Sequence, residues 1–364
     1  MKVEYLKLTN YRNYQSVEVD FCSGVNFVVG KNAQGKTNLV EPLYLLSVFK
    51  SFRNSKLVDC IKEGEASAEI FARVNYDGNF KKNLKLIINR DGANELYVNE
   101  NKISQKKDMY GYLYSVIFSP DELKLVKGGP EVRREFLDTD ISQVSKVYAE
   151  LVMRYDELLA SRNKLLKFGT NTESTNMQLD VYEEQMSIVG SQITLARQNF
   201  VSKLSKNAEK VMQYLSRQTE TLSIVYCGVM GETRQEKTEN LRRILHANRE
   251  KDKMVGFTTV GPHRDDIKMF INGKEVKPFA SQGQQRSVVL SLKIAELDTI
   301  KQEKETPILL LDDVFSELDS ARQKLLIEYL KDSQVFVTST TFKNPKAETM
   351  QKFRVKNGVI TPEK

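Results

Sequence analysis

The stretch that decides the fold class is Gly30-Lys31-Asn32-Ala33-Gln34-Gly35-Lys36-Thr37. It follows an apolar run, Val25–Val29, and precedes a run that suits a helix, residues 37–49. It matches G-x-x-x-x-G-K-[ST], the phosphate-binding loop, whose glycines let successive backbone N–H groups point inward at a phosphate chain. The strand–loop–helix context predicts an α/β protein that binds a nucleotide.

The residue types in this loop have separate chemical tasks. A helix that starts near Lys36 would add its positive N-terminal end. Lys36 would reach the β- and γ-phosphates, and the Thr37 hydroxyl would bind Mg²⁺. The predicted nucleotide-binding residues are Gly30, Lys31, Asn32, Ala33, Gln34, Gly35, Lys36, Thr37 and Asn38.

The composition of the chain limits which binding partners and which cellular compartment we expect. A chain of 364 residues predicts two or three domains. The net charge of +7 favours an anionic partner, nucleic acid or a membrane surface. Scattered cysteines (Cys22, Cys60 and Cys227) predict a reducing compartment, and His246 and His263 form no zinc pattern. The N-terminus lacks a signal-peptide core, and no run approaches the roughly 18 apolar residues of a membrane helix. We therefore expect a cytoplasmic protein.

Two arginines near the loop are candidate phosphate ligands. Residues 2–29 predict three short strands, and the turn Asn10–Tyr14 between the first two carries Arg12, which could contact phosphate or base. Arg53 follows the first helix and could act on the transferring phosphate as an arginine finger. The alternatives are an ordinary turn for Arg12 and a solvated loop for Arg53.

The middle of the chain changes from strand to helical periodicity. Residues 66–76 and 83–98 predict a β meander with turns at Asp91-Gly92 and Asn99-Glu100, followed by a strand at 112–118. Residues 146–168 and 179–217 have helical spacing around a polar linker, 169–177, and predict an antiparallel hairpin about 35 Å long. Because strands return at 222–226, we predict an ATPase-type domain in two segments, 1–120 and 219–364, around a helical insertion, 121–218.

The segments after the hairpin are less informative. Residues 232–252 are highly charged and predict a mobile surface helix or loop. His263, after the turn Gly261-Pro262, is expected to be structural, and Asn272-Gly273 predicts a hairpin turn. The tail from Phe342 gives no clear pattern.

Two further motifs lie in the last third of the chain. Ser281-Gln-Gly-Gln-Gln-Arg286 precedes an expected helix, 287–302, which suggests a second anion-binding geometry. The alternative is an ordinary loop-to-helix capping segment. Ile308–Leu311 predicts a buried strand that ends in two carboxylates, the Walker B pattern. Asp312 would hold the Mg²⁺ shell, and Asp313 would orient or deprotonate the attacking water. Thr338–Thr341, after a further strand, could face the γ-phosphate.

Taken in order, these motifs resemble an ABC-type ATPase head of the chromosome-maintenance class, and most closely the RecF family of bacterial recombinational-repair proteins. The residues that carry the resemblance are Asn10–Tyr14, Gly30–Thr37, Ser51–Arg53, Phe118–Leu123, Gly129-Pro130, Arg133-Arg134, Phe136–Asp138, Gly261–Asp266, Ser281–Arg286 and Leu311–Asp319. The resemblance covers nearly the whole chain. It implies an ATPase head with a mixed sheet, a β meander and an inserted helical domain.

The resemblance also implies an ATP-driven homodimer. Two heads would stack face to face with two ATP molecules between them, and each ATP would meet the phosphate loop of one chain and the signature segment of the other. Asp319 would line the same interface, as the D-loop. The signature residues in this chain are Ser281, Gln282, Gly283 and Gln284. ATP binding would set dimerisation and hydrolysis would release it.

The family binds DNA in an ATP-dependent way. The resemblance implies action at single-strand gaps and junctions with RecR and RecO, helping to load the recombinase, on double-stranded and gapped DNA. Arg133, Arg134 and Arg264 are candidate DNA contacts, and no base-reading motif is present.

Of the predicted catalytic residues, Lys36 and Asp312 match the pattern of ABC ATPases, whereas Asp313 departs from the pattern of many of them. Asp313 stands where many have Glu, which suggests slow turnover. The Gln that many carry after the strand ending near Phe118 is missing, and Thr338–Thr341 replaces a common His. Three alternatives stay open: an SMC-like structural protein, disfavoured by the short insertion; an ATPase subunit coupled to a membrane transporter; and a nucleotide-gated DNA clamp with negligible hydrolysis.

Overall fold

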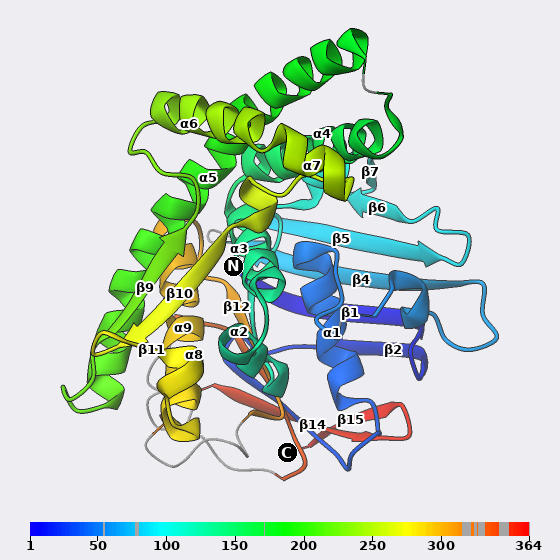
Figure 1. Ribbon diagram of the computed structural model, residues 1–364. Coiled ribbons are helices and arrows are strands. Elements are labelled where there is room, and N and C mark those ends of the chain that lie inside the picture. Colours follow the sequence, from blue (N-terminus) through cyan, green and yellow to red (C-terminus); the bar gives the residue numbers. More distant parts are fainter. Residues whose placement is uncertain are drawn as a thin grey trace. The chain divides into compact units, whose positions relative to one another are not determined.

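A computed structural model describes residues 1–53, 55–76, 80–170, 172–314, 322–323, 326, 332–341 and 349–363 (Figure 1). The chain forms two compact units: unit 1 is Met1–Glu122 with Lys293–Lys364, and unit 2 is Leu123–Leu292. Within the described ranges, none of the helices combines the length and the apolar composition needed to span a bilayer.

A mostly parallel sheet carries the phosphate loop in unit 1. Its strand order is β15-β14-β3-β13-β12-β8. The strands are β3 (Val25–Val29), β8 (Ser115–Phe118), β12 (Ile308–Asp312), β13 (Val335–Ser339), β14 (Met350–Lys356) and β15 (Val359–Glu363). The central strands read as apolar runs because helices or sheets cover both of their faces. The parallel strands β3, β13 and β12 therefore end at one edge of the sheet, where ligands bind in α/β folds.

The predicted β meander forms the second sheet of unit 1, in the order β2-β1-β4-β5-β6-β7. Its strands are β1 (Lys2–Tyr11), β2 (Tyr14–Asp20), β4 (Ser67–Tyr76), β5 (Phe80–Asn89), β6 (Glu95–Val98) and β7 (Asn101–Ile103). The segment predicted at 83–98 is two strands because the chain reverses at Asp91-Gly92, where Gly92 has a φ of +83°. Asn99 and Glu100, both with positive φ, form the other predicted turn.

Helix α1 (Lys36–Val48) follows β3 after the loop and is buried along most of its length. The described part of unit 1 also has short 3-10 turns at η1 (Leu57–Cys60), η2 (Lys106–Met109) and η3 (Pro120–Leu123), the last of which ends at the first residue of unit 2. The strand expected at 112–118 begins only at Ser115.

Unit 2 is built around the predicted helical hairpin. Helices α4 (Lys146–Phe168) and α5 (Glu173–Leu215) pack along each other (Figure 1). The linker is shorter than predicted, because the Thr172 side chain accepts a hydrogen bond from the Thr175 N–H and starts α5 before Leu179. Helices α2 (Lys124–Lys127) and α3 (Pro130–Val144) precede the hairpin.

Residues 219–292 pack against the hairpin. The strands β9 (Leu222–Cys227), β10 (Asp266–Ile271) and β11 (Lys274–Glu275) form a sheet in the order β11-β10-β9, and β9 lies along α5. The compact unit therefore extends to residue 292 and does not stop at the predicted insertion boundary, 218. As a division into functional domains, the three predicted segments stay a prediction.

The charged segment 232–252 is more ordered than the sequence suggests. It forms α6 (Arg234–Ala247) and most of α7 (Arg249–Val255). Lys237, Leu241 and Leu245 recur every four residues and are buried on the side of α6 that packs against α5. The remaining elements are η4 (Pro262–Arg264), α8 (Val276–Phe279) and α9 (Gln282–Glu303), which begins in unit 2 and ends in unit 1.

Candidate nucleotide-binding site

The phosphate loop in unit 1 requires glycine at two positions. A Cβ on Gly30 would lie 2.5 Å from the Val355 carbonyl oxygen, so only glycine fits where β14 approaches. Gly35 caps α1 with a φ of +113°, a conformation that side chains disfavour. Ala33 also has a positive φ, of 64°. The loop therefore curls before the helix, as the sequence pattern predicts.

Lys36 is folded into the loop. Its side chain is only 4% exposed, and its Nζ lies 3.3 Å from the Lys31 carbonyl oxygen and 3.5 Å from Asn32 Oδ1. The same Nζ is 4.0 Å from Asp313 Oδ2. The Lys31 and Asn32 oxygens accept hydrogen bonds from the Lys36 ammonium group. Phosphate oxygens would accept them in their place when a nucleotide is bound.

Thr37 and Asp312 meet at the edge of the parallel sheet. The Thr37 hydroxyl donates to Asp312 Oδ1 over 2.7 Å, and Thr338 of β13 donates to the same oxygen over 2.7 Å. Burial raises the pKa of Asp312 above its ordinary value. The hydrogen bonds from these two hydroxyl groups lower the same pKa, but by less. A hydroxyl and a half-buried carboxylate that converge in this way fit Mg²⁺, which prefers oxygen ligands.

Asp313 has an unusual backbone conformation. Its φ is 53°, in the left-handed region, and its N–H donates to Thr338 Oγ1 over 3.0 Å. Its side chain is 40% exposed. Strained backbone of this kind is common at functional sites.

The β14–β15 hairpin clamps Gln34, a contact that the sequence reading missed. The Asn357 N–H donates to Gln34 Oε1 over 2.7 Å, and the Gly358 N–H donates to the Gln34 carbonyl over 3.3 Å. Asn13 Nδ2 donates to the same carbonyl over 3.0 Å. The Asn357-Gly358 dipeptide between alternating apolar residues was the available signal for this hairpin.

Arg12 forms a buried ion pair. Its Nε and Nη2 lie 2.9 and 2.7 Å from the two oxygens of Glu41, and Tyr11 and Ser51 also donate to that carboxylate. Two further Arg12 donors bond Ser55 and the Asp59 carbonyl. Four of its five N–H donors are thus used within the protein. A nucleotide contact by Arg12 stays a prediction, while the observed arrangement holds the β1–β2 turn on α1.

Arg53 lies beside the phosphate loop. Its Nη1 donates to Asn38 Oδ1 over 2.8 Å, and its charge lowers the pKa of Asp312, a smaller influence than burial. An exposed guanidinium on Asn38 is consistent with the predicted role of Arg53 toward a phosphate.

In unit 2, the signature segment begins α9. The Ser281 Oγ accepts from the Gln284 N–H over 3.2 Å, and the Ser281 N–H donates to Gln284 Oε1 over 2.9 Å. This reciprocal capping box starts the helix at Gln282, so the prediction of a helix from residue 287 was wrong. Ser281, Gln282 and Gly283 are exposed. The predicted D-loop residue Asp319, and the helix expected around it, lie outside the described residues.

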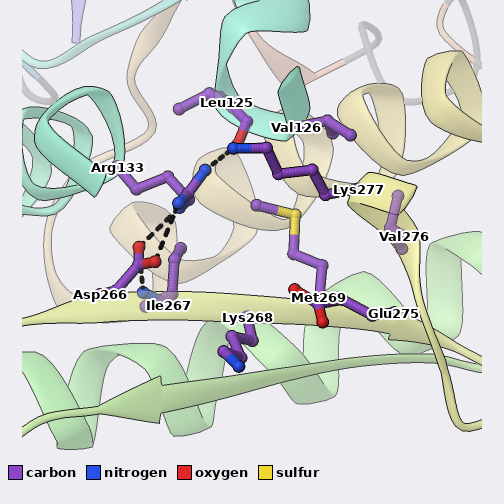
Figure 2. A pocket seen from close by; sticks show the side chains of 10 residues that line it. All are labelled: Leu125, Val126, Arg133, Asp266, Ile267, Lys268, Met269, Glu275, Val276 and Lys277. Carbon is purple, nitrogen blue, oxygen red and sulfur yellow. Dashed lines mark hydrogen bonds and ion pairs between the residues drawn. The ribbon is translucent and has the colours of Figure 1, made fainter. Parts of the chain in front are cut away.

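The arginines proposed for DNA differ in exposure. Arg133 is 6% exposed and makes a two-point ion pair with Asp266, at 2.6 and 2.9 Å (Figure 2). Its Nη1 donates to the Gly128 carbonyl over 3.0 Å, and Lys277 Nζ donates to the same oxygen over 2.9 Å. The cavity beside this pair, about 30 Å³, holds little more than a water molecule. The buried and paired guanidinium gives Arg133 a structural role in this chain, and the contact with DNA stays a prediction that its burial disfavours.

Arg264 is exposed and lies over the Phe257 ring, and Arg134 is half-buried with Nη1 donating to the Asp265 carbonyl. His263 bonds the Thr258 carbonyl and Tyr155, and burial lowers its pKa to about 4. This neutral, buried imidazole agrees with the expected structural role.

The comparisons agree with this geometry. The model of the RecF/RecN/SMC N-terminal domain family matches residues 2–361. The chain is 40% identical over 368 residues to "DNA replication and repair protein RecF" of Alkaliphilus oremlandii, covering 99% of this chain and 100% of that protein. It is 42% identical to the protein of the same name from Geobacillus kaustophilus over 371 residues, covering 98% of each. A solved structure described as "the recombination mediator protein RecF-ATP in RecFOR pathway" aligns with a TM-score of 0.93 and 32% identity, covering 100% of this chain and 98% of that one.

Proposed function

Because this chain belongs to the RecF family of DNA replication and repair proteins, we propose that ATP closes it into a homodimer on DNA and that slow hydrolysis reopens the dimer. A relative has been solved as RecF-ATP, and the phosphate loop here has the residues and the curvature to bind ATP. Family membership leaves no support for the transporter alternative or for the long SMC-like coiled coil.

The observation that carries the proposal is the exposed start of α9. Among the described residues, a Cβ on Gly283 would meet only Ser281 Oγ, at 4.0 Å, so their packing does not require glycine there. Glycine does allow a group from outside to approach the backbone closely. A second chain that brings its bound γ-phosphate to Ser281 and Gly283 accounts for the exposure, and a two-fold axis closes such a pair with two equivalent sites.

Within each site the residues have distinct tasks. Lys36 exchanges the loop oxygens for phosphate oxygens, and Thr37 and Asp312 would hold Mg²⁺, which neutralises phosphate charge when it is bound. Asp313, exposed beside Lys36, orients or deprotonates the attacking water. Its side chain is shorter than the Glu that many ABC ATPases have at this position, which supports slow turnover. For the same reason, the second candidate function is a nucleotide-gated DNA clamp that hardly hydrolyses ATP.

The closed dimer would bind DNA. With RecO and RecR, the dimer would act at gaps and junctions to help load the recombinase, in the cytoplasm. The net charge of +7 and the exposed Arg264 support contacts led by phosphate groups, which depend steeply on salt. Arg134 is a weaker candidate because the Asp265 carbonyl already accepts one of its hydrogen bonds.

The test is sedimentation at fixed low salt, with and without ATP and Mg²⁺, on wild type, Lys36→Ala and Ser281→Arg. Wild type should shift from monomer to dimer with ATP and bind a short duplex at the same ATP concentration. Lys36→Ala should lose ATP binding, whereas Ser281→Arg should bind ATP and stay monomeric. A wild-type protein that binds ATP but remains monomeric, or that binds DNA equally without ATP, would contradict the proposal.

A further inference from the structure

A carboxylate next to the signature segment has no role in the mechanism above. Gln284 Nε2 donates to Glu220 Oε1 over 2.7 Å, and both side chains are partly buried in unit 2. Glu220 lies between the end of α5 and the start of β9 and is far from the signature in sequence. The contact fixes which way the Gln284 amide faces, because its nitrogen must point at the carboxylate.

The orientation of this amide determines how Ser281 is held. With Nε2 on Glu220, the Gln284 Oε1 faces the Ser281 N–H and accepts its hydrogen bond over 2.9 Å. The Ser281 Oγ in turn accepts from the Gln284 N–H over 3.2 Å. Its oxygen is thus used as an acceptor, and its hydroxyl proton remains for an acceptor outside the described part of this chain.

The backbone that carries Glu220 is built for this position. Arg217 and Gln218 have positive φ values of 54° and 66°, which non-glycine residues seldom adopt. Ser216 Oγ accepts from the Glu220 N–H over 3.0 Å. Asn272, in the β10–β11 turn, holds the next residue through its Oδ1, 2.8 Å from the Thr221 N–H. Strained backbone that neighbouring hydrogen bonds hold in place, as here, is common at functional sites.

We propose that Glu220 is a positioning residue for the signature segment: it orients Gln284 so that the Ser281 hydroxyl is presented as a donor to the γ-phosphate bound by a second chain. This inference rests on the proposed function, because the acceptor belongs to the partner in the ATP-bound dimer. It adds a residue outside the motifs, which acts through Gln284 and does not touch the nucleotide.

The chain offers a matched control for the test. Glu209, on α5, also accepts a hydrogen bond from a glutamine amide, Gln213 Nε2, over 3.3 Å, and is also half-buried. Glu220→Ala should weaken ATP-driven dimerisation by about tenfold or more, the expected loss for a hydrogen bond to a charged group. Glu220→Gln, which keeps an acceptor oxygen, should recover most of the loss, and Glu209→Ala should dimerise like wild type. The affinity of the monomer for ATP should not change in any of them.

A mixing experiment separates action across the interface from action within one chain. In a mixed dimer of Lys36→Ala and Glu220→Ala chains, action across the interface places both defects in one site and leaves the other site intact. Dimerisation and ATP turnover should then partly recover. Absence of recovery, with both chains shown to be folded, would overturn the proposal, because each site would then carry one defect.

Hydrogen exchange of the monomer tests the positioning step without the dimer. Glu220→Ala should speed exchange at the Ser281 and Gln284 amides, and Glu209→Ala should not. Wild-type exchange in Glu220→Ala would overturn the inference. If wild type itself fails to dimerise with ATP, the proposed function fails, whereas the exchange result still decides whether Glu220 orders this segment.

Discussion

Arg12 and Glu41 form a two-point ion pair that fastens the turn between β1 and β2 to helix α1, close to the phosphate loop. The Glu41 side chain is fully buried. Burial alone would raise the pKa of Glu41, but the hydrogen bonds from Arg12 and Ser51 outweigh it and hold the pKa below its ordinary value. The pair is therefore charged in the folded protein.

Replacement of Glu41 should be strongly destabilising. Glu41→Ala leaves the Arg12 charge without its partner in a mostly buried place, and breaking a buried pair in this way costs about 3–5 kcal/mol. Urea unfolding should show the loss as a lower midpoint. Lys7 and Glu18 form an exposed pair that water and salt screen, so Glu18→Ala should shift the midpoint far less. Equal midpoints for the two variants would mean that the Arg12–Glu41 pair contributes little.

Asp313→Asn should separate ATP binding from hydrolysis. Asparagine tolerates the left-handed backbone at this position, so the fold should be kept. Loss of a general base lowers turnover by about 10²–10⁴-fold, while ATP-driven dimerisation should persist. Steady-state phosphate release and sedimentation measure the two properties. Unchanged phosphate release would exclude Asp313 as the base, whereas the absence of measurable phosphate release in wild type would favour the clamp with negligible hydrolysis.

Arg264 and Arg133 should behave oppositely toward DNA. Arg264→Ala should reduce affinity for duplex DNA and lower the slope of log K against log salt by about one, as loss of a phosphate contact does. Arg133→Ala should lower thermal stability, because it leaves Asp266 without its ion-pair partner. The checks are salt titrations of DNA binding and thermal melts. A changed salt slope in a folded Arg133→Ala protein would reverse the assignment.

Because the pKa of His263 is lowered in the folded protein, the free energy of unfolding should decrease in mild acid. Its pKa is lowered from 6.5 to about 4, with burial as the main cause, so the unfolded chain binds a proton at a pH where the folded chain does not. This contribution is complete above pH 6.5 and is lost as pH falls toward 4. His263→Gln should flatten the dependence of unfolding free energy on pH in that window. A dependence as steep as that of wild type would assign the acid sensitivity to other groups.

The sequence predicted the elements whose signals are local. The phosphate loop, the meander with its Asp91-Gly92 and Asn99-Glu100 turns, and the helical hairpin all follow from spacing and turn chemistry within short windows. The Arg12–Glu41 and Arg133–Asp266 pairs could not be predicted in this way, because their partners meet only in the tertiary structure. The start of α9 was missed although Ser281 and Gln284 have capping-box spacing, since the motif was interpreted as an anion-binding or capping segment before the helix and not as its first turn.

The parallel sheet also constrains the order in which the site can form during synthesis. Strand β3, which leads into the phosphate loop, has β13 and β14 as its two neighbours, both from the last third of the chain. The clamp on Gln34 comes from residues 357 and 358. A ribosome therefore releases the loop sequence long before the strands that hold it exist, whereas all of unit 2 has already been made by then. The loop therefore gains all of these contacts only when the β14–β15 hairpin has emerged.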